Sequence, residues 1–191
     1  ALVEVQDIVE VDLDGNVHDA QGRRTYVERF IHSAIYKARP DVMSVIHSHS
    51  PAVIPFGVTG ARLRPICHMS GFLGANVPIY EIRYDLGETS DLLVRNQALG
   101  QSLAKTLGSS TVALMRGHGS VTVGHSIKQA VFRAIYTENS ARLQMDAARL
   151  GPVNFLTDGE AQATSDMNDL HLDRPWEMWK RRVKPEGIFE L

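Results

Sequence analysis

The chain has 191 residues, of which 43% are hydrophobic and 22% charged, the balance of a soluble globular protein that is long enough to bury a core. Its net charge of −2, with no overriding basic cluster, argues against binding to nucleic acid or to an anionic membrane surface. No apolar stretch approaches the roughly 20 residues that span a bilayer, and the single cysteine, Cys67, excludes an intrachain disulfide and suits a reducing cytoplasm.

The chain begins with the pattern of a strand, followed by a turn and a helix. Residues 2–12 alternate valine and isoleucine with acids, and Asp14-Gly15-Asn16 forms a turn signal. Apolar residues recur at helical spacing over residues 25–38, where Thr25 and Glu28 match a capping box. Because the first residue already lies within the predicted strand, we expect that part of the N-terminal region is missing from this sequence.

Two apolar runs with the composition of strands each lead into histidines. Residues 42–46 precede His47-Ser48-His49, and residues 111–115 precede Arg116-Gly117-His118-Gly119. Alternate side chains of a strand point to the same face, so His47 and His49 project side by side. A third imidazole on a neighbouring strand makes a three-nitrogen divalent-metal site with an open position, which distinguishes a catalytic from a structural metal. The sequence therefore predicts a metal-dependent enzyme.

The rest of the chain mixes strands and helices without a regular alternation of the two. Helices are predicted over residues 51–56, 92–107 and 127–150, and short strands over residues 62–66, 76–82 and 120–123. Polar residues follow from Asp158, and then a tryptophan-bearing helix over residues 174–183. We therefore expect an α/β layered domain with a largely antiparallel or mixed sheet.

The chain is predicted to divide into two parts. Residues 1–157 form the metal-binding catalytic domain, and residues 158–191 form a C-terminal tail with a helix. This tail is expected to pack on the domain or on a neighbouring subunit.

Glu28 is a candidate for a role beside the metal, and the residues alone leave two interpretations open. A glutamate three residues after a threonine is an ordinary capping-box partner. In the functional interpretation, Glu28 is a carboxylate that moves protons beside the metal. Helical spacing places Glu28 and His32 on one face, so both can look toward one cleft, and spacing alone does not choose between the two interpretations.

Three segments together carry a resemblance to a known family: Tyr26-Val27-Glu28-Arg29-Phe30, Ile46-His47-Ser48-His49 and Arg116-Gly117-His118-Gly119. Over roughly residues 9–150 the chain resembles the class II aldolase/adducin family. The resemblance implies that His47, His49 and His118 are metal ligands and that Glu28 is the catalytic acid/base. It also implies a three-layer α/β/α fold with a central, mostly antiparallel sheet, and a homotetramer with active sites at subunit interfaces. Three imidazoles favour Zn²⁺ or another late divalent ion such as Co²⁺, while a carboxylate in the ligand set would admit Mn²⁺ or Fe²⁺.

One branch of this family is favoured. Residues 54–58 and 63–74 are similar to the decarboxylases of hydroxylated aromatic or pyridine dicarboxylates. This similarity implies a divalent-metal-dependent carbon–carbon lyase, a decarboxylase of a hydroxylated aromatic or heteroaromatic (di)carboxylate in catabolism. The alternatives are a class II aldolase or epimerase for a small sugar phosphate, similar to fuculose-phosphate aldolases, and a non-catalytic adducin-like interaction domain.

Four residues are predicted to contact the small-molecule substrate: Arg64, His68, Phe72 and Arg116. In this interpretation Phe72 walls a flat aromatic ring, and the arginines hold carboxylates by bidentate pairing. The structural alternative places Phe72 in the core and the arginines on the surface.

Overall fold

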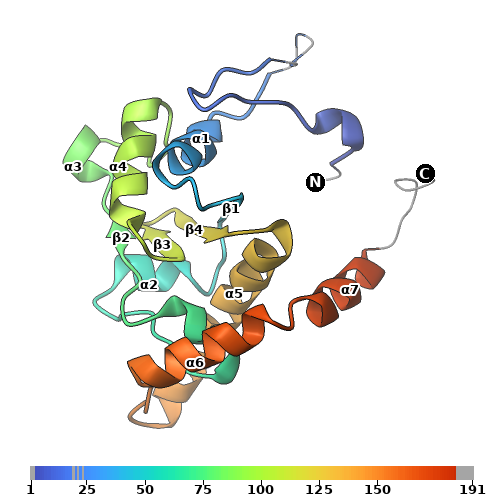
Figure 1. Cartoon of the computed structure of the whole chain (residues 1–191). Coiled ribbons are helices and arrows are strands. Elements are labelled where there is room, and N and C mark those ends of the chain that lie inside the picture. Colours follow the sequence, from blue (N-terminus) through green and yellow to red (C-terminus); the bar gives the residue numbers. More distant parts are fainter. Residues whose placement is uncertain (1–2, 19, 21, 23, 184–191) are drawn as a thin grey trace.

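A computed structural model of the chain describes residues 3–18, 20, 22 and 24–183 (Figure 1). In chain order the elements are the 3-10 helix η1 (Val5–Asp7), α1 (Arg29–Ala38), β1 (Ser44–Ser48), α2 (Ile54–Val58), the 3-10 helix η2 (His68–Leu73), β2 (Ile79–Tyr80), α3 (Arg83–Leu86), α4 (Gln97–Leu107), β3 (Val112–Met115), β4 (Gly119–Gly124), α5 (Ile127–Leu150), α6 (Asp158–Asp169) and α7 (Asp173–Arg182). None of the helices within the described ranges has the length and apolar character needed to cross a membrane.

The strands β1 to β4 form one mixed sheet in the order β1-β4-β3-β2. β1 and β4 pair antiparallel, from Ser44 opposite Gly124 to Ser48 opposite Ser120, and β3 and β4 also pair antiparallel. The short β2 joins the far edge parallel to β3. The mostly antiparallel sheet that the sequence predicts is therefore confirmed.

Helices cover both faces of this sheet, which makes three layers (Figure 1). On one face, α1 and α4 bury side chains such as Ile35 and Leu103 against Val121 of the sheet. On the other face, α2 and α5 cover the sheet, and Phe132 of α5 packs in the same buried cluster as Leu114. Each large apolar side chain buried in this way stabilises the fold by about 1.5–3 kcal/mol. The predicted α/β/α architecture is confirmed.

The strand predicted over residues 2–12 is wrong for the described part of that segment, residues 3–12. The 3-10 helix η1 lies there instead, followed by a single antiparallel bridge between Val11 and Val17. Val3, Val5 and Ile8 are exposed. Alternation of apolar and acidic residues favours a strand, but a strand also needs a neighbour for its backbone hydrogen bonds, and the sheet does not extend to this segment.

The strand predicted over residues 62–66 is also wrong, although Leu63 is buried as expected. Backbone N–H groups of this segment donate to side chains and not to a neighbouring strand. Arg64 N donates to Gln144 Oε1 at 3.0 Å, and Ile66 N donates to Ser70 Oγ at 3.0 Å. Side chains of α5 and η2 thus replace the strand partner that the pattern had suggested. The strand predicted over residues 76–82 shortens to β2.

The predicted helices form, with some shifted starts. α5 has the predicted bounds, and its N-cap is Ser126. α1 begins at Arg29 instead of residue 25. α4 begins at Gln97 instead of residue 92, because Asn96 caps the helix by accepting a hydrogen bond from its first turn.

The polar segment that starts at Asp158 contains a helix, α6, that was not predicted. A capping box begins it: Thr157 Oγ1 accepts from Glu160 N at 3.2 Å, and the Glu160 carboxylate accepts from Thr157 N at 2.8 Å. The Thr-x-x-Glu signal was therefore present in the sequence. α6 packs against η2, and α7 lies against α5, where Trp179 meets the core.

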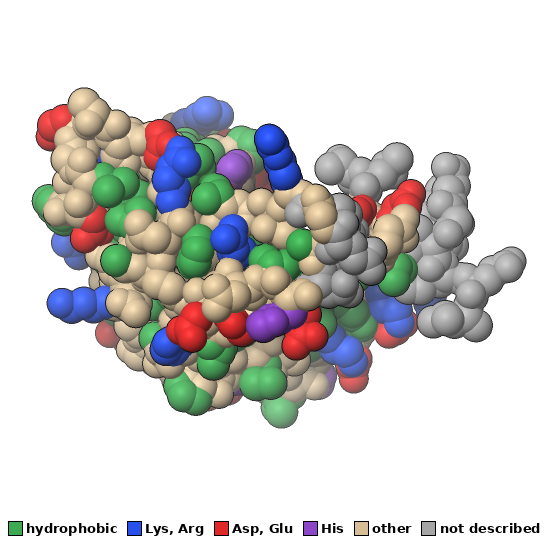
Figure 2. All heavy atoms as spheres, turned by 90° about the horizontal axis from the view of Figure 1, so that it is seen from above, with side chains coloured by type: hydrophobic (Ala, Val, Ile, Leu, Met, Phe, Trp, Pro, Cys, Tyr) green, Lys and Arg blue, Asp and Glu red, His purple; other side chains and the backbone are tan. Residues whose placement is uncertain are grey.

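Charges of both signs share the surface. On the face shown in Figure 2, acidic and basic side chains are intermingled among the coloured residues instead of being separated by sign. This distribution agrees with the near balance of 22 acidic and 20 basic residues in the sequence.

Candidate metal centre

Glu28, His47, His49 and His118 come together at the end of β1. His47 is a residue of β1 and, two positions after Val45, lies on the face that α1 covers. Glu28 immediately precedes α1, His49 immediately follows β1, and His118 lies in the turn between β3 and β4. The potential ligand atoms of all four residues lie within 4.8 Å of one another. The structure therefore brings together the four residues of the predicted centre.

Imidazole nitrogens and carboxylate oxygens converge. His49 Nε2 is 3.0 Å from His47 Nε2 and 2.9 Å from His118 Nε2. The oxygens of Glu28 divide between two histidines, with Oε2 3.4 Å from His47 Nε2 and Oε1 3.4 Å from His118 Nε2. Two ligands about 2.1 Å from one ion and at a right angle are about 3.0 Å apart, so the nitrogen separations suit a shared divalent ion.

The glycines on either side of His118 are required by the backbone. Gly117 has a φ of +68°, a left-handed conformation that glycine adopts without strain. Gly119 lies so close to β1 that a Cβ there would be 2.2 Å from the carbonyl oxygen of Ser48. The turn therefore brings His118 against the end of β1, where His47 and His49 lie.

In both His47 and His118, a backbone carbonyl group accepts a hydrogen bond from Nδ1 and so places a proton on that ring nitrogen. Ser120 O lies 3.1 Å from His47 Nδ1, and Leu92 O lies 2.9 Å from His118 Nδ1. A carbonyl oxygen can only accept, so each Nδ1 donates, and in the neutral imidazole the lone pair is then on Nε2, which faces the centre. A carbonyl on the outer nitrogen is the usual arrangement of a metal-binding imidazole.

Burial and charge favour a cation at this centre. The side chains of Glu28, His47 and His118 are 14%, 11% and 7% exposed. Burial lowers the pKa of His47 to about 4, against the opposing effect of the Glu28 carboxylate, so this imidazole is neutral at neutral pH. His49 Nε2 carries at most one proton and can donate it to His47 or to His118, but not to both. At least one pair of nitrogen atoms therefore faces each other with no proton between them.

Glu28 adds an unsatisfied group to the same centre. Its Oε1 atom is buried and has no hydrogen-bond partner among the described residues. A buried carboxylate oxygen without a donor is unfavourable unless a cation balances it. The donor set of three imidazoles and one carboxylate therefore fits a divalent metal ion.

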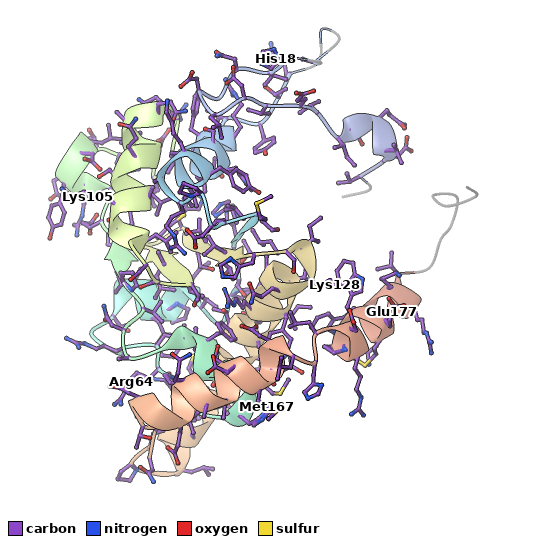
Figure 3. All side chains as sticks on the ribbon, viewed as in Figure 1. His18, Arg64, Lys105, Lys128, Met167 and Glu177 are labelled. Carbon is purple, nitrogen blue, oxygen red and sulfur yellow. The ribbon has the colours of Figure 1, made fainter. Side chains whose placement is uncertain are left out.

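The two arginines predicted to contact the substrate interact with other protein groups. Arg116 Nε lies 2.5 Å from Glu81 Oε2, and the same carboxylate binds Arg83 Nη2 at 2.7 Å. The hydrogen bond from Arg83, with a further one from Arg116, lowers the pKa of Glu81 to about 2. The Arg64 guanidinium carbon lies 4.3 Å from the centroid of the Phe155 ring, and Figure 3 shows Arg64 near the start of α6.

His68 and Phe72 lie on η2, which packs with α5 and α6. His68 is exposed and lines a groove together with residues of α5, α6 and α7. Phe72 is 7% exposed and contacts Phe132 in the core on the α5 side of the sheet, with 6.2 Å between ring centroids. His47 lies on the opposite, α1 side. Substrate contact by these residues and the two arginines stays a prediction.

A glutamate of α5 holds the loop that follows β1. Glu138 Oε2 accepts hydrogen bonds from Ser50 Oγ and from Ala52 N, the latter at 3.1 Å, while Oε1 accepts from Arg142 Nη2 at 2.6 Å. Burial raises the pKa of Glu138, but these hydrogen bonds outweigh burial and lower it overall. Neither this contact nor the carbonyl contacts above were predicted, because no local pattern in the sequence reports a partner so distant along the chain.

The fold and this centre define an α/β/α domain with a candidate metal site of three histidines and a glutamate. Residues 1–145 match the family described as Class II Aldolase and Adducin N-terminal domain. The chain belongs to this family, so the resemblance identified from the sequence motifs is confirmed.

The chain is also similar to decarboxylases. Decarboxylase tropJ of Talaromyces stipitatus is 40% identical, over 91% of the chain and 75% of tropJ. The 3,4-dihydroxyphthalate decarboxylase of Arthrobacter keyseri is 31% identical, over 79% of the chain and 61% of that protein. A crystal structure of an aldolase II superfamily protein from Pseudomonas syringae matches with a TM-score of 0.74 at 23% identity, over 97% of the chain and 74% of that structure, and supports the fold. The two relatives support a lyase enzyme.

Proposed function

We propose that the protein is a divalent-metal-dependent carbon–carbon lyase that decarboxylates a hydroxylated aromatic or heteroaromatic (di)carboxylate. The convergence of three imidazole Nε2 atoms and the Glu28 carboxylate is the observation that carries the proposal. Similarity to two decarboxylases, one of them named for a dihydroxylated aromatic dicarboxylate, supports the reaction and the substrate class.

In this proposal the histidines hold the ion. Decarboxylation leaves an electron pair on carbon, and a divalent ion held by these histidines would supply the Lewis acid that stabilises the developing negative charge. His47, His49 and His118 would bind through Nε2, and the carbonyls on the Nδ1 atoms of His47 and His118 orient these two rings. Imidazole nitrogens would bind an ion without adding negative charge to it, so its positive charge would be retained.

Glu28 is the proposed proton carrier. Its two oxygens are each 3.4 Å from an imidazole nitrogen, longer than a strong hydrogen bond, and Oε1 has no donor among the described residues. A proton from the Glu28 carboxyl would add to the ring carbon, the carboxylate on that carbon would leave as CO₂, and Glu28 would regain a proton from the solvent, so that one proton is taken up for each CO₂ released. The product would be the hydroxylated ring with hydrogen at that carbon.

We further propose a cytoplasmic homotetramer with active sites between subunits. His49 is exposed, so the centre opens to the surface of the chain, where a neighbouring subunit would complete it. Residues 1–157 would carry the centre, and residues 158–191 would pack on this domain or on the neighbour. Light scattering is expected to give about four times the mass of one chain. A fully active monomer would contradict this assembly.

Metal analysis and a CO₂-release assay test the proposed function together. The purified full chain would be analysed for bound zinc, manganese, iron and cobalt. The metal-free protein, reloaded with each ion in turn, would be assayed on 3,4-dihydroxyphthalate and on a panel of hydroxybenzoates. We expect about one ion per chain and metal-dependent release of CO₂. His47→Ala and His118→Ala are expected to lose both.

Other outcomes would overturn the proposal in distinct ways. Stoichiometric metal in both histidine variants would contradict the ligand assignment. Bound metal with cleavage of fuculose 1-phosphate and no CO₂ release would replace the decarboxylase with an aldolase. A chain that binds none of these ions would point to the non-catalytic, adducin-like domain.

A further inference from the structure

Leu92 has an unusual backbone conformation. Its φ is +68°, and among the non-glycine residues in the described ranges no other has a positive φ. In this left-handed region the Cβ atom of an L-residue crowds the backbone, so a bulky residue such as leucine rarely adopts it. Such a conformation persists where surrounding contacts impose it, and residues of this kind cluster at functional sites.

Leu92 contacts the turn that carries His118 through both its backbone and its side chain. Its carbonyl oxygen accepts the hydrogen bond from His118 Nδ1 at 2.9 Å. Its side chain packs against the core between the sheet and the α1 and α4 helices. The Cδ1 atom of Leu92 also lies 3.4 Å from the position that a Cβ on Gly117 would take.

Neighbouring residues hold Leu92 in place. Ser90 Oγ accepts a hydrogen bond from Leu92 N at 3.0 Å, and Asp91 Oδ1 accepts one from Leu93 N at 3.2 Å. Val94, two positions further on, is fully buried in the core. The peptide units on both sides of Leu92 are therefore tied down, and the direction of its carbonyl group is set.

The two histidines with a carbonyl partner differ in how that partner is supported. His47 donates to Ser120 in β4, where the hydrogen bonds of the sheet already fix the carbonyl. His118 donates to Leu92 in the irregular segment before α4, where no sheet holds the backbone. The carbonyl that serves His118 therefore depends on the conformation of Leu92 itself.

We propose that Leu92 is a positioning residue for His118. Its left-handed backbone turns the carbonyl toward His118 Nδ1, holds the imidazole in its Nδ1–H tautomer and leaves the Nε2 lone pair facing the centre. Glycine would adopt the same φ without strain, but it lacks the side chain that packs on the core and beside Gly117. The inference rests on the proposed function in one respect, namely that His118 is a metal ligand.

The tautomer of His118 can be observed directly in the metal-free full chain. In protein labelled with ¹⁵N-histidine, long-range ¹H–¹⁵N NMR spectra distinguish Nδ1–H from Nε2–H, and the signal missing in His118→Gln assigns the residue. The test variant is Leu92→Val, because a β-branched side chain is incompatible with the left-handed region. Leu93→Val makes the same chemical change at the next position, whose φ is not positive, and is the matched control.

We expect the Nδ1–H tautomer of His118 in the unaltered protein and in Leu93→Val, and a shift toward Nε2–H in Leu92→Val. Affinity for Zn²⁺, measured by competition with a chromophoric chelator, is expected to fall about 10–100-fold in Leu92→Val and to change little in Leu93→Val. Ser90→Ala removes the acceptor for Leu92 N and should shift the tautomer in the same direction. It replaces Leu92→Val if that variant does not fold.

Several results would overturn the inference. One is an Nε2–H tautomer of His118 in the unaltered protein. Another is an unchanged tautomer with unchanged Zn²⁺ affinity in a folded Leu92→Val or Ser90→Ala variant, and a third is an equal shift in Leu93→Val. Because the tautomer is recorded without metal or substrate, its result does not depend on whether the protein releases CO₂.

Discussion

At the scale of single residues, the hydrogen bond made by the outer nitrogen of an imidazole determines which nitrogen faces the centre. His47 and His118 each give Nδ1 to a carbonyl, and Glu28 turns one oxygen toward each of them. A carbonyl partner alone is not distinctive, since His125 Nδ1 also lies 2.7 Å from the carbonyl of Asp41 on the surface. What distinguishes the centre is that the remaining nitrogen and oxygen atoms converge.

Glu28→Gln is the prediction that belongs to this scale. The substitution keeps the size of the side chain and an oxygen near the centre but removes the proton-carrying carboxyl. We expect bound metal and thermal stability to be retained and CO₂ release to fall by about 10²–10⁴-fold. Metal analysis and the CO₂ assay on the same preparation check this. Glu177→Gln, on the exposed α7, is the control and is expected to keep full turnover. Unaltered turnover in Glu28→Gln would remove the proton-carrier role.

The sequence predicted these residues unequally well. The spacing of His47 and His49 on a strand, with a Gly-His-Gly turn further on, suffices to predict the group of three because the period of a strand is local. The capping-box interpretation of Glu28 is wrong: Glu28 precedes α1, makes no side-chain cap, and lies beside His47 and His118. The partners of Arg64 and Arg116 were not predictable from residue type. An arginine can pair with any of several side chains, some of them distant in the sequence, and the sequence does not specify which one lies close in the fold.

At the scale of elements, α5 supports the strand that carries His47 and the loop that follows His49. It packs against β1 and β4, and its Arg133 Nη1 donates to Val123 O at 2.9 Å. Its Glu138 holds the loop that follows His49. The bounds of α5 were predictable because helical period and the Ser126 cap are local signals. The strand predicted over residues 2–12, which does not form in the described part of that segment, shows the opposite case, because pairing between strands depends on residues far along the chain.

Glu138→Gln tests this support through its pH dependence. The folded protein lowers the pKa of Glu138 below its ordinary 4.5, so the carboxylate stabilises the fold fully above the unfolded-state pKa. That stabilisation is lost as pH falls through the lowered folded-state pKa. We expect the variant to be less stable by about 1.5–3 kcal/mol at neutral pH, with a difference that shrinks below about pH 4.5. Urea unfolding at several pH values measures it.

Glu177→Gln is again the matched control, because its local ion pair with Lys180 on α7 is exposed. We expect it to change stability by less than about 0.5 kcal/mol at any of these pH values. A Glu138→Gln difference that is independent of pH would show that the charge of Glu138 does not support the loop.

At the scale of the whole molecule, the C-terminal helices are joined to the domain through η2. A Cβ on Gly71 would lie 2.2 Å from Thr164 Oγ1 and 2.3 Å from the carbonyl oxygen of Ala161, so α6 touches the backbone of η2. Asn168 Nδ2 also donates to the carbonyl of His68 at 2.8 Å. The sequence predicts that residues 158–191 pack on the domain or on a neighbouring subunit, but it does not predict this contact, because composition does not report one close approach at a glycine.

Gly71→Ala and Gly159→Ala make the same chemical change on the two sides of this contact. At Gly71 the added methyl group overlaps α6, and we expect a loss of about 1–3 kcal/mol of stability. At Gly159, within α6, a Cβ meets no atom within 4 Å, and alanine is expected to stabilise the helix by about 0.5–1 kcal/mol. Urea unfolding of both variants checks the sign. Equal effects would show that α6 does not rest on η2.

The spread of the candidate ligands along the sequence, from residue 28 to residue 118, has a consequence for unfolding. Because these residues come together only in the folded chain, an ion held by them would bind the folded state and not the unfolded one, and its binding would add to the free energy of unfolding. At a hundredfold excess of free ion over Kd the gain is about 2.7 kcal/mol, so a chelator is expected to lower Tm by roughly 5–10 °C. His47→Ala should be indifferent to the chelator. The ion would then cross-link α1, β1 and the β3–β4 turn in a chain whose single cysteine can form no intrachain disulfide.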